Sequence, residues 1–168
     1  MRRMLDGLYT ASAWLAGLSM IGVLVMVLVT ILSRFFGIAA HGTDSYAGYA
    51  MAGAGFMALA TTLKHGEHIR VTLLLSVLKG KTLKGIELAA LIIATVLSGF
   101  LAYYSASVVW QSWEINDISM GLDATPLWIP QLLMAFGTLV FFIAFCDELV
   151  LELLGQRPSA DTKDAHHE

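Results

Sequence analysis

Four long stretches of this sequence contain no charged residue, and they constrain the fold more than any other feature. They cover residues 7–33, 45–63, 88–113 and 124–146. A helix that crosses the hydrocarbon core of a bilayer needs about 20 residues, each adding about 1.5 Å. Backbone groups in lipid must find hydrogen-bond partners within their own segment, which selects helices. The pattern therefore predicts an all-α membrane protein with four transmembrane helices.

The predicted spans cover about 11–33, 45–63, 88–112 and 125–147 within a single domain over 1–155, followed by a disordered cytoplasmic tail over 156–168. The composition agrees, because 57% of the residues are hydrophobic and only 14% are charged. A soluble domain of this size could not bury so much apolar surface. The first apolar run exceeds the roughly 7–15 residues of a signal-peptide core, so we expect a permanent helix.

The distribution of basic residues predicts the orientation. Nine of the ten Lys and Arg residues lie at the N-terminus, between the second and third spans, or after the fourth. The exception is Arg34 in the first loop, and the third loop carries acids without a base. Loops rich in Lys and Arg stay in the cytoplasm, so we expect both termini inside.

Residues 68–79, between the second and third spans, form a predicted helix that is too short to cross a membrane. On a helical wheel, Thr72, Ser76 and Lys79 share one side and leucines lie opposite. This pattern indicates a cytoplasmic interfacial amphipathic helix, lying beside anionic phospholipid headgroups.

Small residues recur in the second and third spans. The third span has one every four positions over four turns: Ala90, Ala94, Ser98, Ala102 and Ala106. The second has small residues on two faces, one with Ala54 and the other with Gly48 and Gly55. Small residues let helix backbones approach closely within lipid. Two interpretations stay open: packing within this chain, and docking onto another membrane protein.

Several function classes are disfavoured. No Asp, Glu, Lys, Arg or His lies in the interior of a predicted span, although ion-coupled carriers usually place such groups near the midplane. The net charge of −3 disfavours nucleic acid as a partner. The sequence gives no sign of an enzyme, a metal site or a bound cofactor. Cys146 is the only cysteine, the histidines lie at span ends, and there is no phosphate-binding loop.

Three segments of the chain resemble one known family. The first span ends in S-R-F-F at 33–36, and the second begins after Asp44. The second ends in L-K-H-G-E-H-I-R-V at 63–71, and the fourth begins over 119–130 and continues to Gly137. In this order and spacing they resemble the small integral-membrane subunit (DctQ-type) of tripartite ATP-independent periplasmic (TRAP) transporters.

The resemblance implies a multi-pass protein of the bacterial inner membrane with two partners. A large multi-span DctM-type subunit would bind sodium ions and carry a small organic acid. A periplasmic substrate-binding protein of DctP type would deliver that acid. The small subunit would brace the large one and help to dock the binding protein, without a cofactor of its own. Two alternatives remain: a self-sufficient homodimeric carrier or exporter, and a cytochrome-type redox subunit.

Residues at the membrane boundaries are the candidates for contacts with partners or lipid: Arg34, Asp44, His68, Arg70, Glu114, Asp117, Asp123 and Pro130. Arg34 either pairs with Asp44 across the first loop or extends to the headgroups. His68 and Arg70 anchor the surface helix, contact the large subunit or bind headgroups. The three acids of the third loop contact the binding protein or belong to an ordinary solvated loop. Pro130 suits the first turn of the fourth helix.

Overall fold

The structure is a computed structural model that describes residues 2–38, 42–64, 81–121 and 124–154. It contains four long helices: α1 (Arg2–Phe35), α2 (Thr43–Lys64), α4 (Lys81–Glu114) and α5 (Trp128–Leu153). The expected all-helical architecture is confirmed for this part of the chain. The interfacial helix predicted over 68–79 and the tail predicted over 156–168 lie outside the described residues.

The helices extend beyond the predicted spans at most ends. The first begins at Arg2 rather than near residue 11, and the last ends at Leu153 rather than near 147. Charge-free runs mark the apolar part of a helix, whereas its backbone hydrogen bonds continue through the charged residues that follow. At one end the helix is shorter than the expected span, because α5 begins at Trp128 rather than near residue 125 and Pro126 pairs instead with Ile118.

Within the described residues, three helical segments are long and apolar enough to cross a membrane: Leu5–Phe35, Gly85–Glu114 and Trp128–Leu153. The 22 residues of α2 would span about 33 Å, which is sufficient length. Its many alanines, glycines and threonines make it less apolar than the other three. The fourth crossing therefore stays a prediction.

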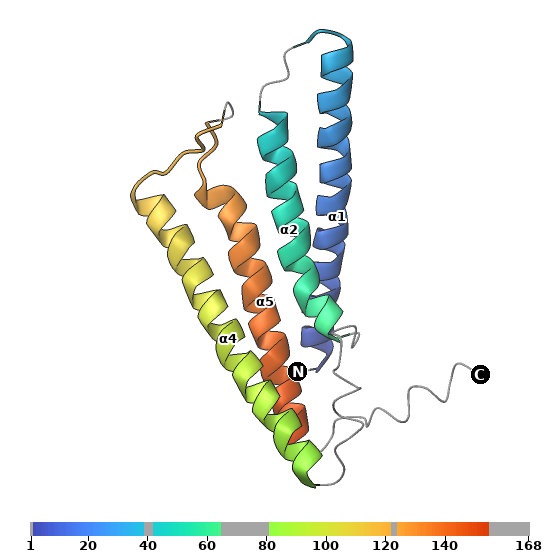
Figure 1. The fold of residues 1–168 in the computed structure, drawn as a ribbon, viewed down its shortest axis with the longest axis vertical. Helices are drawn as coiled ribbons and strands as arrows, with labels where there is room; N and C mark the ends of the chain where they lie inside the picture. Colours follow the sequence, from blue (N-terminus) through green and yellow to red (C-terminus); the bar gives the residue numbers. More distant parts are fainter. Residues whose placement is uncertain (1, 39–41, 65–80, 122–123, 155–168) are drawn as a thin grey trace, which may run out of the picture.

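The helices form a row whose order differs from that of the sequence. α1 packs on α2, α2 on α5, and α5 on α4, so α2 and α5 are the inner helices and α1 and α4 the edges (Figure 1). Of the residues in the most apolar stretch of α1, only 6% are buried, against 28% in the corresponding stretch of α5. The row leaves extensive apolar surface on its edge helices. The inner position of α2 explains its composition, because small residues let two neighbouring helices approach it closely.

The two inner helices approach each other closely along one contact, which we call the seam. A Cβ atom on Gly137 of α5 would lie 2.6 Å from the carbonyl carbon and oxygen of Phe56 in α2. A Cβ atom on Gly53 would lie 3.0 Å from Cδ1 of Leu133. Backbones can come this near only where a side chain is missing, so glycine sets the spacing of the seam.

A buried hydrogen bond joins α1 to α2. The hydroxyl group of Ser12 donates to the main-chain oxygen of Met57 over 2.6 Å. Both residues are almost completely enclosed. The acceptor also belongs to the helix ladder, and a carbonyl oxygen has a second lone pair available for such a bond.

α4 contacts α5 through residues spaced seven apart: Leu91, Ser98, Ser105 and Ser112, all of them buried. A seven-residue step nearly completes two helical turns and keeps side chains on one face. The contact also includes Gly99, where a Cβ atom would lie 3.0 Å from the Phe142 ring.

The four-residue stripe noted in the sequence follows this face only in its middle. Ser98 and Ala102 are buried and Ala94 is half-buried, whereas Ala90 and Ala106 are exposed. Each four-residue step turns about 40° past a full turn, so a stripe of five residues winds off any straight contact. Ser98, Ser105 and Ser112 are all buried, whereas Ala102 is the one alanine of the stripe that is.

Candidate functional site

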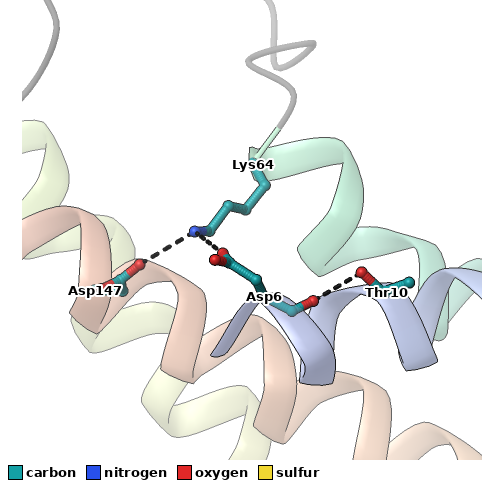
Figure 2. A network of polar contacts seen from close by, with 4 residues as sticks. All are labelled: Asp6, Thr10, Lys64 and Asp147. Atoms are coloured by element: carbon teal, nitrogen blue, oxygen red, sulfur yellow. Dashed lines mark hydrogen bonds and ion pairs between the residues drawn. The ribbon is translucent and has the colours of Figure 1, made fainter. Parts of the chain in front are cut away.

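An ionic cluster joins three helices where α2 ends. The Nζ atom of Lys64 lies 3.5 Å from Oδ1 of Asp6 in α1 and 3.5 Å from Oδ2 of Asp147 in α5 (Figure 2). The hydroxyl of Thr10 donates to the main-chain oxygen of Asp6 over 2.8 Å. We call this end of the row the Lys64 end; the start of α1 and the end of α5 both lie there (Figure 1).

Tyr9 lies beneath the ionic cluster. The ammonium group of Lys64 is 4.6 Å from the centroid of the Tyr9 ring, a cation–π distance. Tyr9 itself is 4% exposed and packs in an apolar cluster with Ala60, Val140 and Ala144. One lysine therefore contacts groups from α1 and α5 while extending from α2.

The two ion pairs differ in their exposure to solvent. The side chain of Asp147 is 18% exposed, whereas that of Asp6 is 64% exposed. Solvent and salt screen the outer pair more, so the Lys64–Asp147 pair is the stronger link. This link crosses the seam between α2 and α5, and its chemistry is that of a structural tie rather than of catalysis.

Sequence reasoning missed this cluster, although a signal was present. Asp6 directly precedes the first charge-free run, and Lys64 and Asp147 directly follow the second and fourth runs. All three boundaries were expected on the same side of the membrane. Opposite charges at matching ends of neighbouring spans predict ion pairs once the neighbours are known.

The structure does not join Arg34 to Asp44. Arg34 lies in the last turn of α1 and Asp44 in the first turn of α2. Across the described residues, no ion pair within 4 Å connects them. Each side chain instead has the sign that suits its helix end. The two helices are linked there by a hydrogen bond of 2.8 Å between the hydroxyl groups of Thr30 and Thr43.

The connection from α4 to α5 is described over 115–121 and 124–127, and we call it the hairpin because its two arms pair at Ile118 and Pro126. Asn116 adopts a φ of 50° and ends α4 with the N–H of Asp117 donating to the oxygen of Ser112 over 3.0 Å. The helix is thus terminated by a residue in the left-handed conformation, which asparagine tolerates. The N–H of Ser119 donates to the oxygen of Thr125 over 2.8 Å and the N–H of Leu127 to that of Asp117 over 3.0 Å, which pairs the two arms through one isolated β-bridge.

Side-chain contacts attach the hairpin to the helices. The rings of Trp113 and Trp128 meet edge to face at 4.8 Å. The hydroxyl of Thr125 donates to the hydroxyl oxygen of Tyr46 in α2 over 3.2 Å. We call this end of the row the hairpin end. Here the expected boundary acids Glu114 and Asp117 are exposed and half-buried, respectively.

Pro130 lies in the first turn of α5, as the sequence predicts, and lines a groove at the hairpin end. The groove has a volume of about 670 Å³ and is bounded by side chains of α1, α2 and α5, including Leu15, Tyr46 and Phe136. Its lining is almost entirely apolar. It is therefore suited to hydrocarbon or to another apolar side chain.

Other candidate residues are placed as follows. His68, Arg70 and Asp123 lie outside the described residues. Cys146 is a free, half-buried thiol on α5. Over the described ranges, no group of three or more His, Cys, Asp or Glu residues gathers into a metal-ligand set.

The chain matches a known protein family. Residues 23–155 match the family described as "Tripartite ATP-independent periplasmic transporters, DctQ component". The matched region begins inside α1, includes α2, α4 and α5, and covers well over half of the chain. No curated protein sequence matches the chain.

Proposed function

This chain belongs to the DctQ component family of the TRAP transporters, and from that premise we propose that it braces the large DctM-type subunit within the membrane. It is a small membrane subunit of such a transporter, and the family is a transporter component rather than an enzyme family. The proposed role is mechanical, because the chain itself would neither bind the substrate nor carry sodium.

The helix row is the observation that carries this proposal. Each inner helix packs between two neighbours, and each edge helix packs mainly against one (Figure 1). Such a row offers broad apolar faces to a larger membrane protein. On the edge helices these faces include Leu18 and Leu24 of α1 and Leu97 of α4, each more than half exposed. Apolar faces of this kind suit packing against other transmembrane helices.

The orientation belongs to the same proposal. We place the Lys64 end in the cytoplasm and the hairpin end in the periplasm, with α2 as the fourth crossing. The bias of Lys and Arg toward the loop after α2 and toward the termini supports this orientation. The inner position of α2 supports its crossing, since its neighbours α1 and α5 shield it from lipid on two sides.

The transport reaction would belong to the assembled complex. The large subunit would couple sodium ions to the uptake of a small organic acid in the bacterial inner membrane. A periplasmic substrate-binding protein would deliver that acid to the membrane pair. These features are typical of the family that the chain resembles, and they assign this subunit the part of a support.

The test is co-purification followed by reconstitution. The chain, expressed with a DctM-type large subunit and extracted in mild detergent, should elute with that subunit. Liposomes containing the pair, supplied with the substrate-binding protein and a sodium gradient, should accumulate a radiolabelled organic acid. Liposomes containing this chain alone should accumulate none.

Three outcomes would overturn the proposal. Sodium-driven uptake by the isolated chain would favour the self-sufficient carrier or exporter. A visible spectrum with haem bands in the purified chain would favour the redox subunit. A chain that never elutes with the large subunit, although both proteins are present in the membrane, would also contradict the bracing role.

A further inference from the structure

Two tyrosine side chains project from α4 into its surroundings. Tyr103 and Tyr104 are 67% and 62% exposed, and their rings meet edge to face at 5.5 Å. At 100° per residue, both lie on the side of α4 turned away from the buried Ser98 and Ser105, which face α5. We call this side the outward side of α4. Whatever surrounds the row at this edge is in contact with the two tyrosines.

The contacts between α4 and α5 keep one antiparallel register. Trp113 contacts Trp128 near the hairpin end. Farther along the pair, a Cβ atom on Gly99 would lie 3.0 Å from the Phe142 ring. The two contacts are equally far apart on both helices, which lie side by side over this length (Figure 1). Positions between these contacts can therefore be matched from one helix to the other.

This register places both tyrosines at the depth of the hydrocarbon core. Tyr103 and Tyr104 lie level with the middle of the α5 segment from Trp128 to Asp147, which is about 28 Å long and has no charge in its interior. Side chains on a helix lean toward its N-terminus, so these two lean away from the hairpin end and deeper into the membrane. Their hydroxyl groups therefore lie at the depth of acyl chains rather than of headgroups.

Neither tyrosine hydroxyl group forms a hydrogen bond with another residue of the described chain. Ser107, also exposed on α4, differs in this respect, because its hydroxyl group donates to the main-chain oxygen of Tyr103 over 2.9 Å. Short side chains such as serine pair with the backbone of their own helix in this way. An unpaired hydroxyl group in hydrocarbon is unfavourable, and acyl chains offer it no acceptor. The two tyrosines therefore need acceptors from outside this chain.

The other described helices show no such need at this depth. Every exposed residue of α5, and every exposed residue of α2 after Tyr46, is apolar or glycine. The exposed side chains of α1 between Ala11 and Leu32 include no hydroxyl group, and the indole of Trp14 carries the one polar hydrogen among them. Trp14 lies in the half of α1 nearer the Lys64 end and leans toward that end. The need for buried acceptors therefore belongs to the α4 edge of the row.

We propose that the outward side of α4 is the surface that contacts the large subunit, and that the hydroxyl groups of Tyr103 and Tyr104 donate to oxygen atoms on a transmembrane helix of that subunit. This proposal rests on the proposed function, which supplies the large subunit as the partner. The acceptors are main-chain carbonyl groups or Ser, Thr, Asn or Gln side chains, which form hydrogen bonds between helices inside membranes. The opposite edge of the row, α1, faces lipid. A second copy of this chain could also offer acceptors, so the experiment distinguishes the two partners.

The first measurement is the affinity of the chain for a DctM-type large subunit in liposomes. Förster resonance energy transfer between the two labelled proteins, followed as added lipid dilutes them, gives Kd as a mole fraction. Tyr103→Phe/Tyr104→Phe removes two hydroxyl groups and keeps both rings, so Kd should rise about five- to tenfold. Tyr46→Phe is the matched control, because it removes a tyrosine hydroxyl group from α2 at the hairpin end, and Kd should stay unchanged. Neither α4 hydroxyl group bonds a described residue, so the double variant alone should unfold at the same detergent concentration as wild type.

The second measurement identifies the neighbour of each edge helix by photo-crosslinking. Phe100 lies between the two tyrosines on the outward side of α4 and is 57% exposed, and Ile21 of α1 is 59% exposed. Phe100→p-benzoylphenylalanine and Ile21→p-benzoylphenylalanine place the same photoreactive group on the two edges. Irradiation of the complete pair in liposomes should link residue 100 to the large subunit and residue 21 to lipid.

The outcomes separate this inference from the bracing role. A wild-type pair that does not assemble contradicts the bracing role. An assembled pair whose Kd is unchanged by Tyr103→Phe/Tyr104→Phe overturns only the contact through α4. A crosslink from residue 100 to lipid alone, or to a second copy of this chain, overturns it as well. A crosslink to the large subunit from residue 21 instead of residue 100 would show that α1 is the edge in contact.

Discussion

Gly137 meets the backbone of Phe56 so closely that a methyl group on the glycine would lie 2.6 Å from the Phe56 carbonyl group. The neighbouring atoms are main-chain atoms of α2, which cannot rotate away as a flexible side chain would. Any residue larger than glycine at this position must therefore push α2 and α5 apart. The absence of a side chain at residue 137 therefore sets the distance between α2 and α5 at this point.

Gly137→Ala should destabilise the chain by about 1–3 kcal/mol, the usual cost of overpacking a tight contact. Gly55→Ala is the matched control, because no atom lies within 4 Å of a Cβ built at Gly55 in α2. The free energy of unfolding can be measured for both by titration of mixed micelles with denaturing detergent. Equal stability of the two variants would contradict the described spacing of the seam.

Ser12→Ala should lower the free energy of unfolding by about 0.5–1.5 kcal/mol, the range for a hydrogen bond between transmembrane helices. The substitution removes the donor that joins α1 to Met57 of α2. Ser107→Ala is a suitable control, because its hydroxyl donates to Tyr103 of its own helix on an exposed face. The same micelle titration applies, and a control as destabilised as Ser12→Ala would argue against an interhelical role.

Lys64→Met should destabilise the chain by about 1–2 kcal/mol, between the values for exposed and buried pairs, because it leaves the half-buried Asp147 without its cation. Replacing both partners, as Lys64→Met/Asp147→Leu, should recover most of the loss. The coupling energy from this double-mutant cycle measures the pair directly. Strict additivity of the two single substitutions would show that the pair contributes nothing.

Reporter fusions should place the Lys64 end in the cytoplasm and the hairpin end in the periplasm. Green fluorescent protein fused to either terminus should fluoresce, since it matures in the cytoplasm. Alkaline phosphatase inserted after Ile38 or after Gly121 should be active, since it needs the periplasm. Activity at Ile38 but not at Gly121 would show that α2 fails to cross, and would refute the four-span topology.

The helices themselves were predictable because charged side chains are costly in hydrocarbon, so segments that cross a bilayer lack them. The charge-free runs located all four helices, and only α5 begins later than its run suggests, at Trp128. The order of neighbours in the row was not predictable. Lipid is as apolar as leucine, so a lipid-facing position and a helix-facing position carry similar residues, and only small residues distinguish the contacts.

The candidate site was partly visible in the sequence for the same reason. Boundary acids such as Glu114 and Asp117 stand out against apolar spans, whereas the pairing of Lys64 with Asp147 needs knowledge that α2 adjoins α5. The hairpin had one local cue, since Asn116 tolerates a positive φ. Ala124, with a φ of 46°, gave none, because alanine rarely adopts that conformation.

The order of the row means that the chain is two helical hairpins, α1–α2 and α4–α5, joined side by side. A bending load across the row is then resisted where the two halves meet. The two hairpins meet at the close backbone contact of Gly137 with α2 and at the ion pair of Lys64 with Asp147. The contact between the two hairpins therefore decides whether the row behaves as one rigid unit or as two.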